Sequence, residues 1–243
     1  MGLFFRRRRE SAPPERGEGA LPSHIAFIMD GNGRWATKRG LPRESGHRAG
    51  AKAFRRVARY CFDSGIPAVT VYAFSTENWK RPEHEVEEIM KLLSSYIDEA
   101  FSQFSEENAE IRFIGRRDGL DPELLSKMQR LEDASRGRKC KLTIALNYGG
   151  RDEIARAASR LAAAGVTEIT EKALSEAMDN PAVPDPDLVV RTGGDQRISN
   201  FLLWQSAYAE YVFTPTLWPD LDRQELDSVF EDYGRRHRRF GGL

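Results

Sequence analysis

Residues 25–34 combine an acid, two glycines and an arginine after an apolar run, and these residue types can bind a phosphate and a metal ion together. The five apolar residues that open the stretch are typical of a buried parallel strand, which delivers Asp30 to its carboxyl end, where open α/β sheets bind ligands. Gly31 and Gly33 let backbone N–H groups approach an anion, and a helix beginning near Arg34 points its positive end there. An acid beside an anion is favourable only with a divalent cation between them. The stretch therefore indicates metal-assisted phosphate chemistry, with a helix-capping Asp in a tight turn as the alternative.

Polar side chains also follow the next predicted strand, at 67–74. Ser75, Asn78 and Arg81 offer hydrogen bonds and charge to a phosphate, and Trp79 offers a flat apolar wall. The alternative is a polar loop that holds one buried tryptophan. A similar polar segment, Asn-Tyr-Gly-Gly-Arg, follows the predicted strand at 141–147.

The segment after the predicted strand at 187–191 is the most basic of these loops. Arg191 and Arg197 flank a glycine pair, and Ser199 stands where it can cap a following helix. Two guanidinium groups and a hydroxyl group suit a diphosphate, because arginine binds phosphate oxygens through two parallel hydrogen bonds. Ordinary surface ion pairs are the alternative.

Two acids and further basic residues complete the set. Arg43 and His47 follow the first motif, and a histidine can donate to phosphate or move a proton near neutral pH. Glu210 lies among apolar residues and requires a cation or a metal as its partner. Asp30 and Glu210 are the only acids that this reasoning assigns to the site, which suits Mg²⁺, since that ion takes one or two carboxylates plus phosphate oxygens and waters.

The amino-acid composition indicates one globular domain that does not bind nucleic acid in general. The 243 residues include 37 basic and 37 acidic side chains, so an anion site must come from local clustering. The two cysteines fit neither a metal spacing nor a disulfide framework, which indicates a reducing, cytoplasmic compartment. We predict a flexible arm at 1–22 and a catalytic domain at 23–243. The arm's Leu-Phe-Phe and four arginines can contact the anionic inner face of a membrane, or be a solvated tail.

Apolar runs that alternate with helical patterns predict an α/β fold with a mainly parallel six-stranded sheet and helices around it. The predicted strands are 24–29, 67–74, 111–115, 141–147, 187–191 and 210–213. The predicted helices are 46–63, 83–105, 121–134, 150–164, 170–178, 199–206 and 222–232. The helix at 83–105 has a broad apolar stripe, which packs in a core or lines a channel for a hydrocarbon.

Six segments, in this order along the chain, resemble the cis-prenyltransferases, and among them the bacterial undecaprenyl diphosphate synthases. They are 24–35 (HIAFIMDGNGRW), 46–51 (GHRAGA), 72–82 (YAFSTENWKRP), 147–151 (NYGGR), 191–200 (RTGGDQRISN) and 239–242 (RFGG). The resemblance implies a homodimeric, Mg²⁺-dependent enzyme with a hydrophobic tunnel. Such an enzyme extends an allylic diphosphate, such as farnesyl or geranyl diphosphate, with isopentenyl diphosphate and leaves a Z double bond at each step. The implied product is a Z-polyprenyl diphosphate for a cell-wall lipid carrier.

The resemblance also implies a role for each matching residue. Asp30 engages Mg²⁺ as the catalytic acid, and Glu210 completes the metal site. The allylic diphosphate is held by Gly31, Asn32, Gly33, Arg34, Arg43 and His47. Isopentenyl diphosphate is held by Arg191, Arg197 and Ser199, while Arg239 and Gly241 match a motif that reaches the partner subunit's site. The matching segments add Trp35, Ser75, Thr76, Glu77, Trp79, Arg81 and Ile198 to the substrate-binding residues.

Two positions call for separate interpretation. Asn78 matches the family's proton acceptor, yet a carboxamide is a poor base, so we expect it to orient substrate or pass the proton to diphosphate. Asp195-Gln196 replaces a Glu-His pair found in many bacterial members, so a metal contact by that histidine does not carry over.

Other functions are less consistent with the sequence. Haloacid-dehalogenase phosphohydrolases require a second acid where this chain has Asn32. Non-catalytic partner subunits lack the acid that is present here as Asp30, and trans-prenyltransferases carry an Asp-Asp-x-x-Asp motif that this chain lacks. Product length stays open between short-chain and undecaprenyl products.

Overall fold

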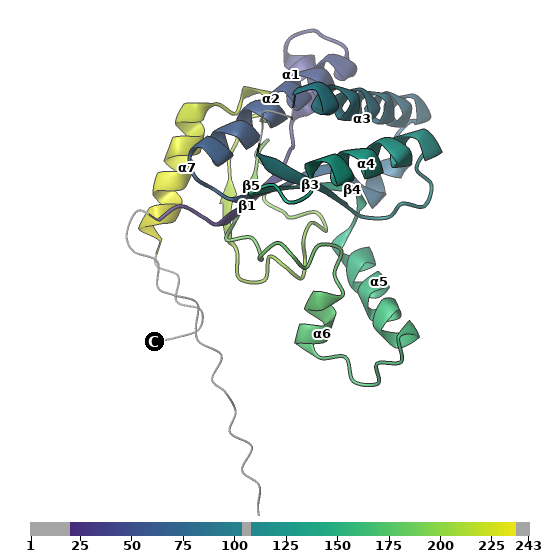
Figure 1. Ribbon diagram of the computed structural model, residues 1–243. Coiled ribbons are helices and arrows are strands. Elements are labelled where there is room, and N and C mark those ends of the chain that lie inside the picture. Colours follow the sequence, from purple (N-terminus) through teal and green to yellow (C-terminus); the bar gives the residue numbers. More distant parts are fainter. Residues whose placement is uncertain (1–19, 104–107, 237–243) are drawn as a thin grey trace, which may run out of the picture.

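The computed structural model describes residues 20–103 and 108–236, and within them the six predicted strands form one parallel sheet (Figure 1). The strands are β1 (His24–Ile28), β2 (Ala68–Ser75), β3 (Ala109–Ile114), β4 (Cys140–Tyr148), β5 (Leu188–Arg191) and β6 (Glu210–Phe213). Most of the predicted arm, together with Arg239 and Gly241, lies outside the described residues.

The order of the strands is β3-β4-β2-β1-β5-β6, with every neighbouring pair parallel. The chain moves from β1 to one side of the sheet for β2 to β4 and then to the other side for β5 and β6. The order in which strands are added to the sheet thus reverses at β1. At such a point, open α/β sheets form a ligand crevice at the carboxyl ends of the strands. Ile28 pairs with Tyr72 on one side and with Arg191 on the other, so the polar segments after β1, β2 and β5 meet at one edge.

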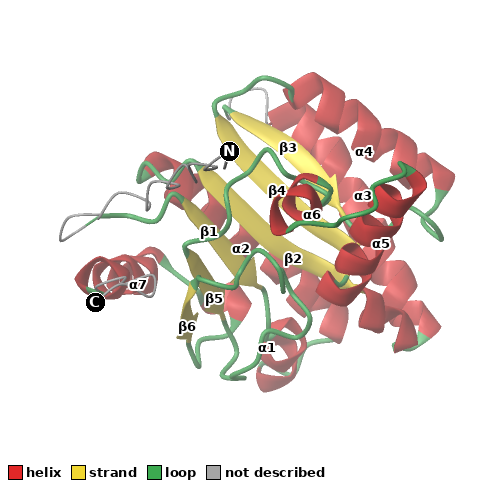
Figure 2. Cartoon of the chain, turned by 90° about the horizontal axis from the view of Figure 1, so that it is seen from below, coloured by secondary structure: helices red, strands yellow, loops and turns green. Residues whose placement is uncertain are grey.

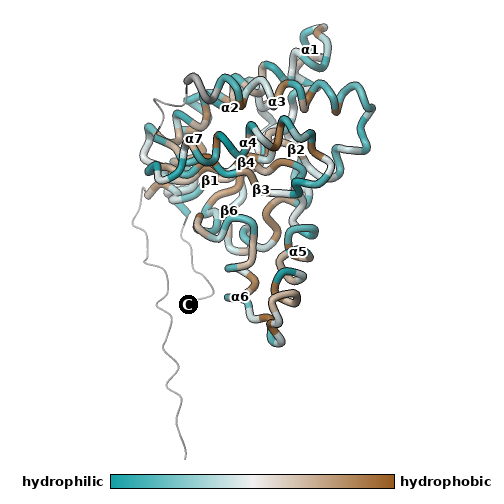
Figure 3. Tube along the Cα trace, turned by 45° about the vertical axis from the view of Figure 1, so that its right-hand side comes forward, coloured by the Kyte–Doolittle hydropathy of each residue, from teal (hydrophilic) through white to brown (hydrophobic). Residues whose placement is uncertain are grey.

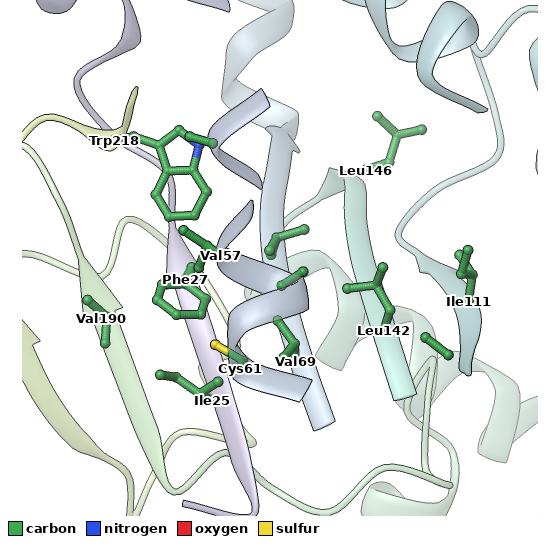
Figure 4. Close-up of a cluster of buried hydrophobic side chains, with 14 of the residues drawn as sticks. Ile25, Phe27, Val57, Cys61, Val69, Ile111, Leu142, Leu146, Val190 and Trp218 are labelled. Carbon is green, nitrogen blue, oxygen red and sulfur yellow. The ribbon is translucent and has the colours of Figure 1, made fainter. Parts of the chain in front are cut away.

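The larger core lies between one face of the sheet and four helices. Ile25 and Phe27 alternate with Ala26 and Ile28 along β1, so the larger pair of side chains points into this core. Figure 4 shows Val57 of the overlying helix α2 beside Phe27. Figure 3 shows the hydrophobic stretches of the trace concentrated at the strands. The four helices are α2 (Arg43–Asp63), α3 (Glu83–Gln103), α4 (Pro122–Ser135) and α7 (Arg223–Arg235).

The opposite face has a smaller core and less helical cover than expected (Figure 2). The predicted helix at 199–206 is wrong, because this segment consists of turns and bends. Ser199, Asn200 and Leu202 have φ angles of 48°, 65° and 43°, which a right-handed helix excludes. Phe201 and Leu202 nevertheless pack on the sheet, which accounts for the apolar pattern that suggested a helix.

The remaining helical elements are short or close to their predicted bounds. They are α1 (Asn32–Lys38), η1 (Thr76–Lys80), α5 (Gly150–Ala163), α6 (Glu171–Glu176) and η2 (Trp218–Asp220). Helix α2 begins three residues earlier than predicted because Pro42, with a φ of −56°, precedes its first residue. Among the helices of the described residues, none combines the length and apolar character that crossing a membrane requires.

Candidate active site

Asp30 is fixed by its main chain at the junction of β1, β5 and η2. Its N–H donates to the Thr192 hydroxyl oxygen at 3.1 Å, and its carbonyl oxygen accepts from that hydroxyl group at 2.8 Å. The Trp218 N–H donates to the same carbonyl oxygen at 3.0 Å. The position of Asp30 is therefore set by backbone contacts that do not involve its carboxylate.

The Asp30 carboxylate lies between two arginines. Arg191 contacts one oxygen at 2.8 Å, and Arg34 contacts the other at 3.0 Å. Burial acts to raise the pKa of Asp30, but the hydrogen bonds from Arg191 and Arg34 outweigh it and hold the pKa below its ordinary value. Asp30 is therefore an anion at neutral pH, as the sequence motif predicts.

Arg191 connects the acid to the loop that follows β5. Its side chain is only 5% exposed, and its guanidinium group also donates to the Ser199 hydroxyl group at 2.7 Å and contacts Asp195 at 3.3 Å. Its Nε atom is buried and has no hydrogen-bond partner within the described residues. Arg197 extends from the same loop, 64% exposed, and pairs with Asp195 at 2.7 Å. These groups form what we call the Arg191 cluster: Arg191, Asp195, Arg197 and Ser199.

A glycine at position 193 allows the β1 and β5 loops to approach each other. Gly193 has a φ of 88°, and a Cβ atom there would lie 2.6 Å from the Arg34 guanidinium group. Arg34 instead donates to the Gly193 carbonyl oxygen at 2.5 Å. The prediction that Ser199 caps a helix is wrong, because turns follow it. Its hydroxyl oxygen instead accepts a hydrogen bond from Arg191.

The loop after β2 is held in shape by its own side chains. Ser75 and Asn78 form a capping box at η1, in which the Ser75 N–H donates to the Asn78 Oδ1 at 3.0 Å. The Trp79 indole N–H donates to the Asn147 Oδ1 at 2.8 Å. Glu77 accepts a hydrogen bond from Asn200 Nδ2 at 3.0 Å. The loop after β2 is thus joined directly to the end of β4 and to the loop after β5.

A second group of basic residues surrounds a carboxylate that the sequence analysis missed. Glu85, on α3, is 8% exposed, and its Oε1 lies 3.0 Å from Arg81, 3.6 Å from Arg43 and 3.6 Å from His47. Burial, with the nearby Arg81 and Arg43, lowers the pKa of His47 more than Glu85 raises it. The i,i+4 spacing of Arg81 and Glu85 is the one sequence signal for this acid.

Asn32 lies against a notch in helix α2 made by two glycines. A Cβ atom at Gly46 would lie 2.0 Å from the Asn32 carbonyl oxygen, and one at Gly50 would lie 2.3 Å from Asn32 Oδ1. That Oδ1 atom is buried and has no hydrogen-bond partner within the described residues. Burying a polar atom without a hydrogen-bond partner costs free energy, and a ligand that donates a hydrogen bond to the atom can offset this cost.

An apolar cavity of about 130 Å³ opens beside Asn32 and His47. It lies between the sheet and helices α2 and α3, so part of the apolar stripe of α3 lines it. Its other lining residues are apolar apart from Arg55. The apolar lining includes Met29, Phe54, Val71, Ala73, Ile89, Leu93, Tyr96, Ile97, Ile111, Phe113, Leu131, Leu142, Ile144 and Trp218.

Glu210 and Asp30 of the same chain lie at opposite edges of the sheet, so a metal ion that both contact stays a prediction and would need Glu210 from another subunit. Glu210 pairs with Leu188, which pairs with Ile25, five residues before Asp30. Strands rise about 3.3 Å per residue, so the two acids are on the order of 15 Å apart. Glu210 instead forms an ion pair with Arg236 at 2.9 Å.

Trp35 and Ile198 contact neighbouring elements of the protein, and their role in substrate binding stays a prediction. The Trp35 indole N–H donates to Asp220 of η2 at 2.6 Å, and the Arg39 guanidinium carbon lies 4.3 Å from the Trp35 ring centroid. Arg39 also donates both to Asp220 and to the carbonyl of Trp35. Ile198 packs against the smaller core.

The donor set at Asp30 fits a magnesium ion that is shared with a phosphate ligand. Asp30 and Asp195 contact the same guanidinium nitrogen of Arg191, so two carboxylates lie close together. Mg²⁺ takes one or two carboxylates and completes its shell with phosphate oxygens and waters. No cluster of three or more His, Cys, Asp or Glu side chains suited to a metal occurs in 20–103 and 108–236.

Comparison with known proteins gives consistent matches over nearly the whole chain. The model of a family described as "Putative undecaprenyl diphosphate synthase" matches residues 28–241. The isoprenyl transferase of Agrobacterium fabrum is 47% identical over 237 residues, which are 95% of this chain and 96% of that one. The isoprenyl transferase of Aquifex aeolicus is 46% identical over 222 residues, or 91% and 96% of the two chains.

Solved structures share the same architecture. Lavandulyl diphosphate synthase from Lavandula x intermedia, solved in complex with dimethylallyl diphosphate, superposes with a TM-score of 0.87 at 30% identity and covers 91% of this chain and 98% of its own. A probable undecaprenyl diphosphate synthase from Campylobacter jejuni gives a TM-score of 0.78 at 35% identity, with 91% and 99% coverage.

Proposed function

Because the chain belongs to the undecaprenyl diphosphate synthase family and is a cis-prenyltransferase, we propose that it condenses isopentenyl diphosphate with an allylic diphosphate in a Mg²⁺-dependent reaction. One observation carries the proposal. One group of basic side chains contacts Asp30, and a second group, whose Arg43 lies beside Gly33, borders an apolar cavity through His47. Two anionic substrates, one with a long hydrocarbon chain, require this arrangement.

The allylic substrate is assigned to the cavity side. Its diphosphate would contact Arg43, His47 and Arg81 beside the Gly31–Gly33 turn, and its hydrocarbon would enter the cavity past Asn32. Isopentenyl diphosphate is assigned to the Arg191 cluster, where Arg197 is exposed and the Arg191 Nε has an unused donor. Asp30 then lies between the two diphosphates.

In the reaction, the bond between the allylic C1 and its diphosphate oxygen breaks, and the double bond of isopentenyl diphosphate forms a new carbon–carbon bond to C1. A proton then leaves the isopentenyl unit, and the new double bond has Z geometry. Arginine side chains stabilise the charge on the departing diphosphate, which is the electrostatic contribution expected to dominate. Mg²⁺ held by Asp30 and diphosphate oxygens would supply further neutralisation of that charge.

Asn78 is proposed to orient substrate rather than to accept the proton. Its Oδ1 atom already accepts the Ser75 N–H, which leaves the Nδ2 group as a donor. A donor suits a diphosphate oxygen, and that oxygen is a better base than a carboxamide. The diphosphate itself is therefore the proposed proton acceptor.

A polyprenyl product such as undecaprenyl diphosphate is the first candidate, since isoprenyl transferases match this chain over nearly its full length. During synthesis of such a product, the cavity bounded by α2 and α3 must widen as the hydrocarbon chain grows. A short Z-prenyl product is the second candidate. It is favoured by the small volume of about 130 Å³.

We further propose that the enzyme is a homodimer in which each C-terminal segment serves its partner's site. Arg236, close to Arg239 in sequence, is anchored to Glu210 at the amino end of β6. In Figure 1 this end of α7 lies far from α1. This end of α7 is thus remote from the chain's own α1, which supports a role for the segment that follows it at another subunit's site.

The direct test incubates the purified protein with radiolabelled isopentenyl diphosphate, Mg²⁺ and either farnesyl or geranyl diphosphate. Chromatography of the products, after removal of the diphosphate, gives chain length and primer preference together. Incorporation that EDTA abolishes and Mg²⁺ restores supports the proposal. Release of phosphate from simple monoesters without incorporation would contradict it.

A further inference from the structure

The Glu85 carboxylate occupies the centre of the basic group that borders the cavity through His47. One oxygen, Oε1, faces three groups: Arg81 NH1 at 3.0 Å, Arg43 NH2 at 3.6 Å and His47 Nε2 at 3.6 Å. Each of the three is a residue that the sequence assigns to phosphate binding. An acid that is 8% exposed requires compensation for its lost hydration, and here that compensation comes from groups that bind substrate.

The contacts of Glu85 differ in length, and the difference leaves donors unused. Only the Arg81 contact is a hydrogen bond, because the other two exceed hydrogen-bond distance. His47 Nε2 is buried and has no hydrogen-bond partner within the described residues. The Arg43 guanidinium is attracted to Glu85 by its charge and His47 Nε2 faces the same oxygen, so both groups point to one place while neither forms a hydrogen bond with it.

The three groups come from two separate elements. Arg43 and His47 are on α2, whereas Arg81 and Glu85 flank the start of α3. Without a carboxylate between them, the positive charges would repel each other, and the exposed Arg43 side chain would turn to solvent. Arg43 also lies over Gly33, where a Cβ atom would approach its guanidinium group to 3.1 Å, so its position affects the turn next to Asp30.

We propose that Glu85 is a positioning residue that holds Arg43, His47 and Arg81 in the geometry that receives the diphosphate of the allylic substrate. The inference rests on the proposed function. The main chain of Glu85 belongs to the first turn of a long helix, and its side chain is buried against the three basic groups. It acts on one of the two substrates only, since its contacts do not extend to the Arg191 cluster.

The test compares Glu85→Gln, Glu85→Asp and the matched control Glu83→Gln. Glu83 is a second acid in the first turn of α3, so its substitution reproduces any general effect on the positive end of the helix. Steady-state condensation is measured with farnesyl diphosphate and isopentenyl diphosphate, each varied at a saturating level of the other. Circular dichroism and thermal unfolding confirm that each variant is folded.

We expect Glu85→Gln to raise the KM for farnesyl diphosphate by about tenfold, the typical effect of losing a charge-assisted contact. The KM for isopentenyl diphosphate and kcat should change by less than about threefold, and Glu83→Gln should behave as wild type. Glu85→Asp keeps the charge and should give a KM for farnesyl diphosphate between those of wild type and Glu85→Gln. If Glu85→Gln does not fold, the KM values of Glu85→Asp for the two substrates are compared instead.

Three results would overturn the inference. Equal changes in both KM values would show a general structural role, and an unchanged farnesyl diphosphate KM would show no role. A lowered farnesyl diphosphate KM would show that Glu85 competes with the substrate. A wild-type protein that forms no condensation product would instead overturn the proposed function, on which the inference depends.

Discussion

Asn200 donates a hydrogen bond from Nδ2 to the Glu77 carboxylate at 3.0 Å, and this bond joins the loop after β5 to the loop after β2. Asn200 is held for this contact by the left-handed φ of 65° and by the Arg151 N–H, which donates to its Oδ1 at 2.9 Å. The two loops carry groups assigned to different substrates. Their geometry is therefore coupled at a single side-chain contact.

This contact predicts a non-additive double-mutant cycle. Glu77→Ala and Asn200→Ala should each lower kcat/KM for isopentenyl diphosphate, and the double variant should be no worse than the more damaging single variant. The expected coupling energy is about 1 kcal/mol, typical of one hydrogen bond. Steady-state kinetics of the four proteins measures it. Strictly additive losses would show that the two residues act independently.

Asp30→Ala should abolish condensation while the protein stays folded. The hydrogen bonds that fix residue 30 involve its main chain, so removal of the carboxylate leaves them intact. We expect a loss of at least about a thousandfold in kcat, since the charge that balances the reacting diphosphates is removed. Product chromatography and thermal unfolding are the measurements, with Asp118→Ala, whose side chain is 89% exposed, as control. Substantial turnover by Asp30→Ala would exclude the metal role.

Arg197→Ala should weaken binding of isopentenyl diphosphate selectively. The Arg197 side chain is exposed and, among the residues that the structure describes, pairs with Asp195 alone, so its loss should leave the fold unchanged. We expect the KM for isopentenyl diphosphate to rise by about tenfold or more, with a much smaller change for the allylic substrate. A similar rise in both KM values would contradict the assignment of the two diphosphates.

The buried His24 should make stability depend on pH in a defined window. Burial, the largest effect, lowers its pKa from 6.5 to about 4 in the folded protein. Between those values the unfolded chain binds a proton that the native protein does not, so stability falls as pH decreases from about 6.5 to about 4, by about 3 kcal/mol in all.

The measurement is the free energy of unfolding in denaturant at several pH values for wild type and His24→Gln. Pro184 offers a carbonyl oxygen to His24 Nδ1 at 2.6 Å, and the neutral ring accepts from Thr70 at its other nitrogen. His24→Gln should therefore be less stable than wild type at pH 7 but lose less stability on acidification. Parallel pH profiles for the two proteins would show that another group controls the dependence.

The strands could be predicted well because each is a continuous apolar run bounded by polar residues. All six were found, and the carboxyl-edge position of Asp30 and Arg191 followed from parallel topology alone. The segment at 199–206 was predicted wrongly because Phe201 and Leu202 pack on the sheet from a backbone with positive φ, which composition does not reveal.

Pairwise contacts between distant segments were harder to predict. Glu210 is the first residue of the strand predicted at 210–213, so parallel topology places it at the amino edge of the sheet, and only the family resemblance assigned it to the metal site beside Asp30. Glu85 could not be predicted as part of the site, because an acid in the first turn of a helix is already explained by its favourable interaction with the helix dipole. Only the tertiary approach of α2 to α3 brings three basic side chains to it.

The glycine notch in α2 has a consequence for local unfolding. Gly46 and Gly50 each weaken a helix by up to about 1 kcal/mol relative to alanine, so the first turns of α2 have little intrinsic helical stability. They are held by the docking of Asn32 and by the Trp218 indole N–H, which donates to the Gly50 carbonyl oxygen at 2.8 Å. Amide hydrogens in this part of α2 should exchange faster than those near Cys61, and a ligand that immobilises Asn32 should slow that exchange.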